Sequence, residues 1–246
     1  MDNGANGEIG METVALIVAG GNGKRTGQDI PKQFINVNDK PILIYTLESF
    51  QKHPEVDSIE VVCLDGWHEI LRAYAKQYGI TKIDQIVRSG KTVQESIRNG
   101  VLALQGKIAD DAIVIIHDGI RPMIDEEVIS DLLVVCRKRG NAVSSLPYNE
   151  QIFRIKDEES TQEYVIRETL RRVMTPQAYQ YGKLYSAYEE AFSKGIGIYG
   201  SSYTNTMMVD LGTTLYFSKG SDKNIKITTA DDIALFKAML SIKNNL

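Results

Sequence analysis

A run of glycines and basic residues near the start of the chain is the segment best suited to bind an anion. Residues 19–27 read AGGNGKRTG, and Lys32 follows shortly after them. Glycine lets backbone N–H groups approach an anion closely, and Lys24, Arg25 and Lys32 place three positive charges within nine residues. Phosphate is the anion that suits such donors. We therefore predict a phosphate-binding loop, in which Arg25 and Lys32 contact the ligand and Lys24 is solvated.

The spacing around this loop excludes two common phosphate-binding motifs. A Walker loop needs glycine where this chain has Val18, and serine or threonine where it has Arg25. A dinucleotide-binding loop opens a helix with its third glycine and is followed by an acid about 20 residues later. Here Pro31 and a basic cluster fill the turn instead. An NAD(P)-dependent oxidoreductase is therefore disfavoured.

Side chains suited to phosphate binding recur in four later segments. These are Gly90 with residues 96–100 (SIRNG), residues 117–122 (HDGIRP), Arg167 with residues 175–177 (TPQ), and residues 224–229 (NIKITT). Arginine and lysine are the usual partners of phosphate groups. Asp118 ends an apolar run, where an unpaired carboxylate is costly, so we expect it to bind a ligand or a metal ion.

Composition limits the classes of partner. The 246 residues include 28 basic and 32 acidic ones, and the net charge of −4 argues against a nucleic-acid-binding protein. No apolar stretch approaches ~20 residues, so no membrane span is predicted. Cys63 and Cys136 lie in apolar runs and can build neither a disulfide framework nor, with three scattered histidines, a zinc site, which favours the cytoplasm. Residues 1–12 are expected to be a flexible leader and residues 13–246 a single domain.

The elements that must position these residues alternate between strand and helix. Strands are predicted at residues 13–18, 58–64, 84–87, 112–117 and 142–146. Helices are predicted at residues 41–50, 66–78, 93–104, 126–139 and 229–240. This alternation indicates an α/β, Rossmann-like fold with a mostly parallel sheet and helices on both faces. Ligands bind such sheets at the carboxyl ends of the strands, where all the motifs fall.

Residues 151–167 interrupt the alternation. Residues 151–155 and 163–167 predict a β-hairpin with a charged tip at residues 156–159, and its strands are too polar for the core. We expect an arm of about residues 150–172 that projects from the domain. Either a partner subunit or solvent would cover it.

In this order, the motifs resemble those of the CTP-dependent polyol-phosphate cytidylyltransferases, the enzymes that make CDP-methylerythritol and CDP-ribitol. The first loop, followed by PKQF at residues 31–34, resembles sugar-phosphate nucleotidyltransferases in general, whereas HDGIRP, TPQ and NIKITT are similar to the cytidylyltransferases alone. The resemblance spans roughly Glu12 to Leu240. It implies a nucleotidyltransferase (GT-A-like) fold, a homodimer joined through the hairpin arm, and transfer of CMP from CTP to a polyol phosphate, with Mg²⁺ as cofactor and pyrophosphate as product.

The resemblance also implies a role for each candidate residue. The catalytic cations would be Arg25, Lys32 and Lys226. The nucleotide would be bound by Ala19, Gly20, Gly21, Gly23, Gly90 and Ser96. The acceptor would be bound by Asp118, Arg121, Thr175 and, from the neighbouring subunit, Arg167. Asp118 is also the candidate Mg²⁺ ligand.

Three of these assignments have structural alternatives. Ser96, Arg167 and Lys226 could instead be exposed side chains, with Lys226 in a surface strand. His117 is expected to be a packed strand residue with a satisfied ring rather than a catalyst.

Two departures from the family pattern concern the acceptor. Enzymes that act on methylerythritol carry D-T-[IM]-K where this chain has residues 150–153 (EQIF), and T-D-[DE] near residues 202–204 (SYT), which contain no acid. The acceptor therefore stays open between methylerythritol 4-phosphate and a pentitol phosphate such as ribitol 5-phosphate. A non-catalytic CTP-binding regulator and a sugar-1-phosphate nucleotidyltransferase remain alternative functions.

Overall fold

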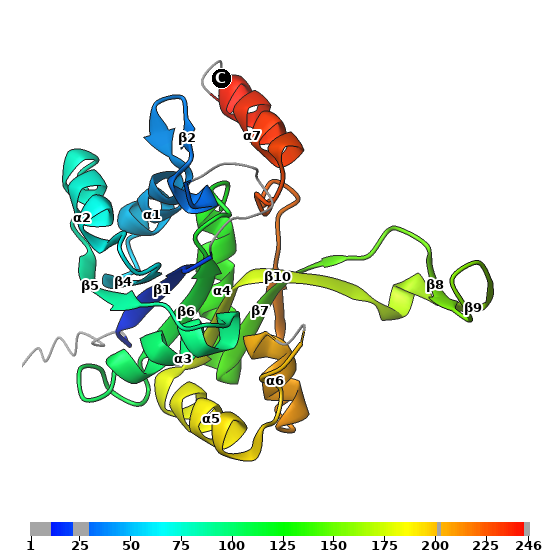
Figure 1. Ribbon diagram of the computed structural model, residues 1–246. Helices are drawn as coiled ribbons and strands as arrows, with labels where there is room; N and C mark the ends of the chain where they lie inside the picture. Colours follow the sequence, from blue (N-terminus) through cyan, green and yellow to red (C-terminus); the bar gives the residue numbers. More distant parts are fainter. Residues whose placement is uncertain (1–10, 22–29, 201–202, 244–246) are drawn as a thin grey trace, which may run out of the picture.

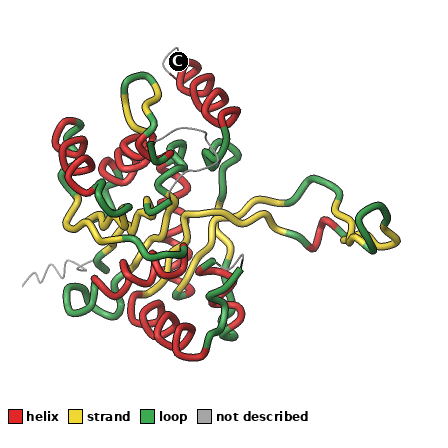
Figure 2. The backbone as a smooth tube through the Cα atoms, viewed as in Figure 1, coloured by secondary structure: helices red, strands yellow, loops and turns green. Residues whose placement is uncertain are grey.

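A seven-stranded sheet lies at the centre of the computed structural model, which describes residues 11–21, 30–200 and 203–243 (Figures 1 and 2). Its strands are β1 (Thr13–Ala19), β4 (Ser58–Cys63), β5 (Ile83–Arg88), β6 (Ile113–Asp118), β7 (Asn141–Pro147), β10 (Arg171–Gln180) and β11 (Phe217–Lys219). They lie side by side in the order β11-β7-β10-β6-β1-β4-β5. The expected leader falls almost wholly in residues 1–10, outside the described residues.

The sheet is mostly parallel, as predicted. β1 pairs in parallel with β4 and β6, β4 with β5, and β7 with β11. The exception is β10, which runs antiparallel to both β6 and β7. No apolar run marks β10 in the sequence (RRVMTPQAYQ), so sequence analysis did not find this strand.

Helices cover both faces of the sheet, which confirms the predicted layers (Figure 1). They are α1 (Ile42–Lys52), α2 (His68–Gln77), α3 (Val93–Ala103), α4 (Glu126–Arg139), α5 (Tyr181–Lys194) and α6 (Thr204–Asp210). The alternating residues of β1 divide between the two faces. Ala15 and Ile17 pack with α1, α2 and α4, whereas Val14 and Leu16 pack with α3, α5 and α6. None of the described helices is long and apolar enough to cross a membrane.

Helix α7 (Ala230–Lys243) closes the chain over a small separate core. Thr229 begins it as predicted, because its hydroxyl accepts from Asp232 N while Asp232 Oδ2 accepts from Thr229 N. Phe236 of α7 packs with Ile227 and with Val37, which belongs to the short pair β2 (Asn36–Val37) and β3 (Lys40–Pro41). The preceding segment, residues 224–229, is not a strand, so the alternative that placed Lys226 in one is wrong.

The predicted hairpin is present and projects from the sheet as an arm (Figure 1). Its strands are β8 (Ile152–Ile155) and β9 (Thr161–Val165), which pair antiparallel with each other only. The second strand begins and ends about two residues earlier than predicted, and Arg167 follows it in the short 3-10 helix η3 (Arg167–Thr169). β10 then carries the chain back from the arm into the sheet.

Candidate active site

A cavity of about 500 Å³ lies at the carboxyl ends of three neighbouring parallel strands, β1, β4 and β5. Gly20 and Gly21 line it from the loop after β1, while Gly90 and Ser96 line it from the loop and helix after β5. These are four of the six predicted nucleotide-binding residues. Gly23 lies outside the described residues, and Ala19 does not line the cavity.

Glycine is required at two of these positions by close approach of the chain. A Cβ on Gly20 would lie 2.5 Å from Ser89 Cβ, and a Cβ on Gly90 would overlap the Glu95 side chain. Backbone groups of both loops can therefore line the cavity where any side chain would clash.

Ser96 holds the loop after β5 in place. Its hydroxyl accepts a hydrogen bond from Gly90 N at 3.0 Å and donates one to Thr92 O at 2.8 Å. The side chain is buried, with 4% of the residue exposed. The alternative in which Ser96 is an exposed helix-surface hydroxyl is therefore wrong.

The glycine-rich loop is anchored where β1 ends. Gln33 Nε2 donates to Ala19 O at 2.7 Å, which fixes the 3-10 helix η2 (Lys32–Phe34) beside the strand. The Lys32 side chain passes Gly21, since its Cε would lie 3.7 Å from a Cβ built there. Lys32 therefore flanks the cavity, which is the position expected of a lysine that binds a triphosphate. Lys24 and Arg25 lie outside the described residues.

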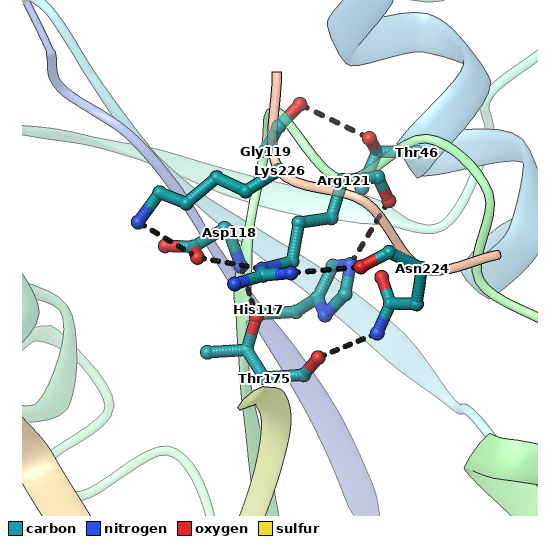
Figure 3. A network of polar contacts seen from close by, with 8 residues as sticks. All are labelled: Thr46, His117, Asp118, Gly119, Arg121, Thr175, Asn224 and Lys226. Carbon is teal, nitrogen blue, oxygen red and sulfur yellow. Dashed lines mark hydrogen bonds and ion pairs between the residues drawn. The ribbon is translucent and has the colours of Figure 1, made fainter. Parts of the chain in front are cut away.

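A second group of charges surrounds the carboxyl end of β6 (Figure 3). Asp118 Oδ2 accepts from Arg121 Nε at 3.0 Å and contacts Lys226 Nζ at 3.1 Å. Arg121 also donates from Nη1 to Asn224 O at 2.8 Å, so it connects β6 to the segment that carries Lys226. Three predicted site residues thus form one ion-paired group that we call the Asp118 cluster (Asp118, Arg121 and Lys226), although Lys226 is more than 100 positions from the other two in the sequence.

The cluster carries one negative and two positive charges. Burial alone would raise the pKa of Asp118, but Lys226 and Arg121 outweigh burial and lower this pKa to about 2. Asp118 is therefore ionised at neutral pH. The surplus positive charge suits a site that binds phosphate.

Thr175 and Asn224 complete the surroundings of the cluster. Thr175 lies at an irregularity in the pairing of β10 with β7, and its hydroxyl accepts from Asp118 N at 3.2 Å. Asn224 Nδ2 donates to Thr175 O at 2.7 Å (Figure 3). Sequence analysis gave Asn224 no role, although it begins the NIKITT motif; here it joins β10 to the Lys226 segment.

His117 is packed inside the sheet, as predicted, but its ring is only half satisfied. The ring is fully buried against Phe50, and Nε2 donates to Arg121 O at 3.2 Å. Nδ1 has no hydrogen-bond partner among the described residues, which corrects the expectation of a satisfied ring. Burial lowers the pKa of His117 to about 4, so the neutral form with the proton on Nε2 fits these contacts.

The cavity and the Asp118 cluster lie at the same edge of the sheet. Val18 of β1, which lines the cavity, is paired with Asp118 of β6 in the parallel register. Neighbouring strands lie about 4.8 Å apart. The cavity and the Asp118 cluster are therefore neighbours at the carboxyl ends of adjacent strands.

Comparison with known proteins shows which family the chain belongs to. Residues 13–242 match the family model of 2-C-methyl-D-erythritol 4-phosphate cytidylyltransferase (IspD). The chain belongs to this family. This match confirms the resemblance given by the ordered motifs. It also confirms the enzyme class, because cytidylyltransferases are nucleotidyltransferases.

Two kinds of cytidylyltransferase are among the relatives of this chain. A ribitol-5-phosphate cytidylyltransferase of Lacticaseibacillus paracasei is 58% identical over 229 residues, covering 93% of this chain and 98% of the relative. A 2-C-methyl-D-erythritol 4-phosphate cytidylyltransferase of Clostridium novyi is 33% identical, covering 92% and 95%. A solved 4-diphosphocytidyl-2C-methyl-D-erythritol synthase of Anaerococcus prevotii shares the fold, with a TM-score of 0.80, 23% identity and coverage of 94% and 96%.

Among the described residues predicted to bind the acceptor, Arg167 is the one that neither belongs to the Asp118 cluster nor contacts it. It lies on the arm, half exposed, where Nε pairs with Glu168 at 3.1 Å and Nη1 donates to Asn149 O at 3.3 Å. The arm projects away from the sheet in this chain (Figure 1). Arg167 therefore lies apart from the Asp118 cluster of its own chain.

Proposed function

We propose that this chain transfers CMP from CTP to ribitol 5-phosphate, giving CDP-ribitol and pyrophosphate. The single observation that carries the proposal is the Asp118 cluster beside the glycine-lined cavity, in a member of the cytidylyltransferase family. The choice of acceptor is supported by the relative that acts on ribitol 5-phosphate, which is 58% identical, against 33% for the methylerythritol enzyme.

The reaction is a displacement at the α-phosphorus of CTP. An oxygen of the acceptor phosphate forms the new P–O bond, and the bond from the α-phosphorus to the bridging oxygen breaks. Pyrophosphate leaves with that electron pair. No covalent enzyme intermediate is needed, so the protein contributes positioning and stabilisation of negative charge.

Each described residue has a task in this displacement. Lys226 would hold the α-phosphoryl oxygens where charge develops, because its ammonium lies in the Asp118 cluster, at the same edge of the sheet as the cavity. Lys32 would hold the triphosphate from the opposite side, together with Arg25. Arg121 would bind the acceptor phosphate, and Thr175 would add a hydroxyl to it. Within the described residues, both partners of Asp118 contact Oδ2, so Oδ1 remains for the acceptor's hydroxyl groups.

The donor set fits a Mg²⁺ ion held mainly by substrate. No group of three or more His, Cys, Asp or Glu side chains gathers among the described residues, so they form no metal cage. Mg²⁺ commonly uses one or two carboxylates together with substrate phosphates, and the ionised Asp118 provides one. When bound, the ion would neutralise charge on the triphosphate.

The proposal includes a homodimer formed through the arm. Phe153 and Tyr164 are paired across β8 and β9, and 52% and 72% of these residues are exposed. A groove of about 540 Å³ beside them extends to Arg167. Exposed apolar side chains of this kind mark an interface. A second copy that covers them would bring Arg167 toward the partner's Asp118 cluster.

Steady-state assays of pyrophosphate release test the function. We expect turnover with CTP, Mg²⁺ and ribitol 5-phosphate, and a lower kcat/KM with methylerythritol 4-phosphate. Lys226→Ala should lower kcat by on the order of 10²–10³ while the protein stays folded, because one well-placed charge donor is lost. Lys223→Ala is the matched control, since Lys223 is an exposed lysine in the same segment.

Two results would contradict the proposal. Higher kcat/KM with methylerythritol 4-phosphate would overturn the choice of acceptor. Tight binding of CTP without turnover on any polyol phosphate would favour the alternative of a non-catalytic regulator.

A further inference from the structure

An aromatic ring lies beside the cluster at the position where the family pattern has an acid. Tyr203 immediately precedes α6, and Lys226 Nζ lies 5.8 Å from the centroid of its ring. The same ammonium contacts Asp118 Oδ2 at 3.1 Å. Lys226 is therefore held between a carboxylate and the face of an aromatic ring. A cation within about 6 Å of a ring centroid is attracted by the ring quadrupole.

The backbone of Tyr203 is fixed by the start of α6. Its N–H donates to Thr206 Oγ1 at 2.9 Å, and its carbonyl accepts from Thr206 Oγ1 and from Met207 N, each at 2.9 Å. The Thr206 side chain therefore caps the start of α6 by bonding the backbone of Tyr203. The ring is thus attached to a rigid backbone rather than to a mobile loop.

Buried hydrogen bonds connect this helix start to the nucleotide cavity. Thr204, next to Tyr203, is 1% exposed, and its hydroxyl shares a 2.7 Å bond with Tyr188 OH. Tyr188 OH in turn donates to Gln94 Oε1 at 3.1 Å. Gln94 lies in α3, two residues before Ser96. The position of Tyr203 is therefore tied to the wall of the cavity.

We propose that Tyr203 is a positioning residue for Lys226, holding its ammonium over the α-phosphate of CTP during transfer. This inference rests on the proposed function, because it needs a phosphate for Lys226 to meet. A ring attracts the ammonium without accepting a strong hydrogen bond. Lys226 has three N–H donors, and Asp118 is its one ion-pair partner among the described residues, which leaves donors for phosphate oxygens.

An acid at position 203 would act differently. It would pair with Lys226 through hydrogen bonds and add a negative charge close to the triphosphate. The tyrosine keeps the cluster at one negative and two positive charges. The absence of an acid near residues 202–204 is therefore a feature of this site rather than the loss of a function.

Kinetics of position-203 variants test the inference. We expect Tyr203→Phe to keep kcat within about twofold, and Tyr203→Leu to lower kcat about twofold to fivefold, the range of an exposed cation–π contact. KM for CTP should stay unchanged, because the contact acts in the transition state. A series of phenylalanines with one, two and three ring fluorines should lower kcat stepwise, since each fluorine weakens the ring quadrupole. Tyr199→Leu, an exposed tyrosine in the loop before α6, is the control.

A direct measurement of the contact separates this inference from the proposed function. With ¹³C-dimethylated lysines, which keep their charge, the Lys226 signal is identified by its loss in Lys226→Arg. We expect a ring-current shift that disappears in Tyr203→Leu and persists in Tyr203→Phe. An unchanged Lys226 signal, or equal kcat for the leucine and phenylalanine variants, overturns the inference. A wild-type enzyme without turnover overturns the proposed function, while the spectra still decide whether the ring holds Lys226.

Discussion

The pKa values of two carboxyl groups in this protein are shifted in opposite directions. Asp118 has two cationic neighbours, so its carboxylate stays ionised although burial opposes it. Glu60 of β4 is more deeply buried, with 1% exposed against 19% of the Asp118 side chain, but receives only a hydrogen bond from Gln85 and the more distant charge of Lys107. Burial therefore dominates and raises the pKa of Glu60 to about 8. The first carboxylate is suited to binding a ligand, whereas the second is a neutral group inside the sheet.

Glu60 should make stability depend on pH. Its pKa is raised from 4.5 in the unfolded chain to about 8 in the fold, so its contribution is fully present below about pH 4.5 and is lost as the pH rises toward 8. Glu60→Gln removes this loss. We expect the variant to gain stability relative to wild type, on the order of 4 kcal/mol by pH 8. Urea unfolding between pH 5 and about pH 9 measures the difference.

Exposed Glu69 of α2 provides the control, because Glu69→Gln should follow the wild-type pH curve. Parallel curves for Glu60→Gln and wild type would show that Glu60 is already ionised in the folded protein.

Helix α3 shows how one element serves both the core and the site. Ser96 faces the cavity, while four residues later Gly100 allows the helix to lie directly on β1 and β4. A Cβ at Gly100 would come within 2.7 Å of Leu16 Cδ1 and 2.8 Å of Val62 Cγ2. The height of the helix above the sheet, and hence the position of Ser96, depends on the absence of a side chain at Gly100.

Gly100→Ala should destabilise the protein despite its location in a helix. Alanine would favour the helix by about 1 kcal/mol. Overpacking against the strands would cost about 1–3 kcal/mol, so we expect a net loss of stability and a higher KM for CTP. Thermal unfolding and kinetics measure both effects.

Val62→Ala makes room for the new methyl group, so it should lower the free energy of unfolding less in the Gly100→Ala protein than in wild type. Additive losses in the double variant would contradict this explanation.

The elements that could be predicted from sequence are those with a local signal. Apolar runs identified β1 and β6, and Gly140, with φ of +85°, ended α4 at the predicted residue. Sequence analysis did not predict β10, because this strand belongs partly to the arm and partly to the sheet and therefore has no continuous apolar run. The NIKIT pattern indicates a strand, yet Ile227 packs against α7 and makes one backbone bond to Ile120 instead.

Site residues that belong to sequence motifs could be predicted, whereas a residue that only the fold brings to the site could not. Asp118, Arg121 and Lys226 were found from their motifs, and the structure shows that they meet. The ring of Tyr203 could not be found, because nothing in the spacing relates position 203 to position 226. The two positions are close together because α6 begins at the edge of the sheet to which the chain returns after β11.

At the scale of the whole molecule, the arm is the part of the fold that a single chain leaves uncovered. Its apolar side chains contribute to no described core, and Arg167 lies on it, away from its own cluster. β10 runs from the base of the arm to Thr175 and on into the sheet. In the proposed homodimer, each active site would therefore combine the core of one chain with the arm of the other.

Mixing two inactive variants tests this shared site. Arg167→Ala lacks the arm residue and Lys226→Ala lacks the core residue, so each homodimer should have low activity. After subunit exchange, half of the dimers are mixed and each has one intact site, so activity should return to about a quarter of wild type.

Without exchange, or with arms disrupted by Tyr164→Lys, activity should stay low. Failure to recover any activity in verified mixed dimers would mean that Arg167 does not act across the interface.

The order of the site residues along the chain has an evolutionary consequence. The cavity is lined by residues between positions 18 and 96, whereas the Asp118 cluster and Tyr203 come from positions 118 to 226. Under the proposed function, substitutions in the second half of the gene can therefore alter the residues assigned to the acceptor, Asp118, Arg121 and Thr175, while the residues that line the cavity are inherited unchanged. A lineage can in this way acquire a new polyol substrate without rebuilding its recognition of CTP.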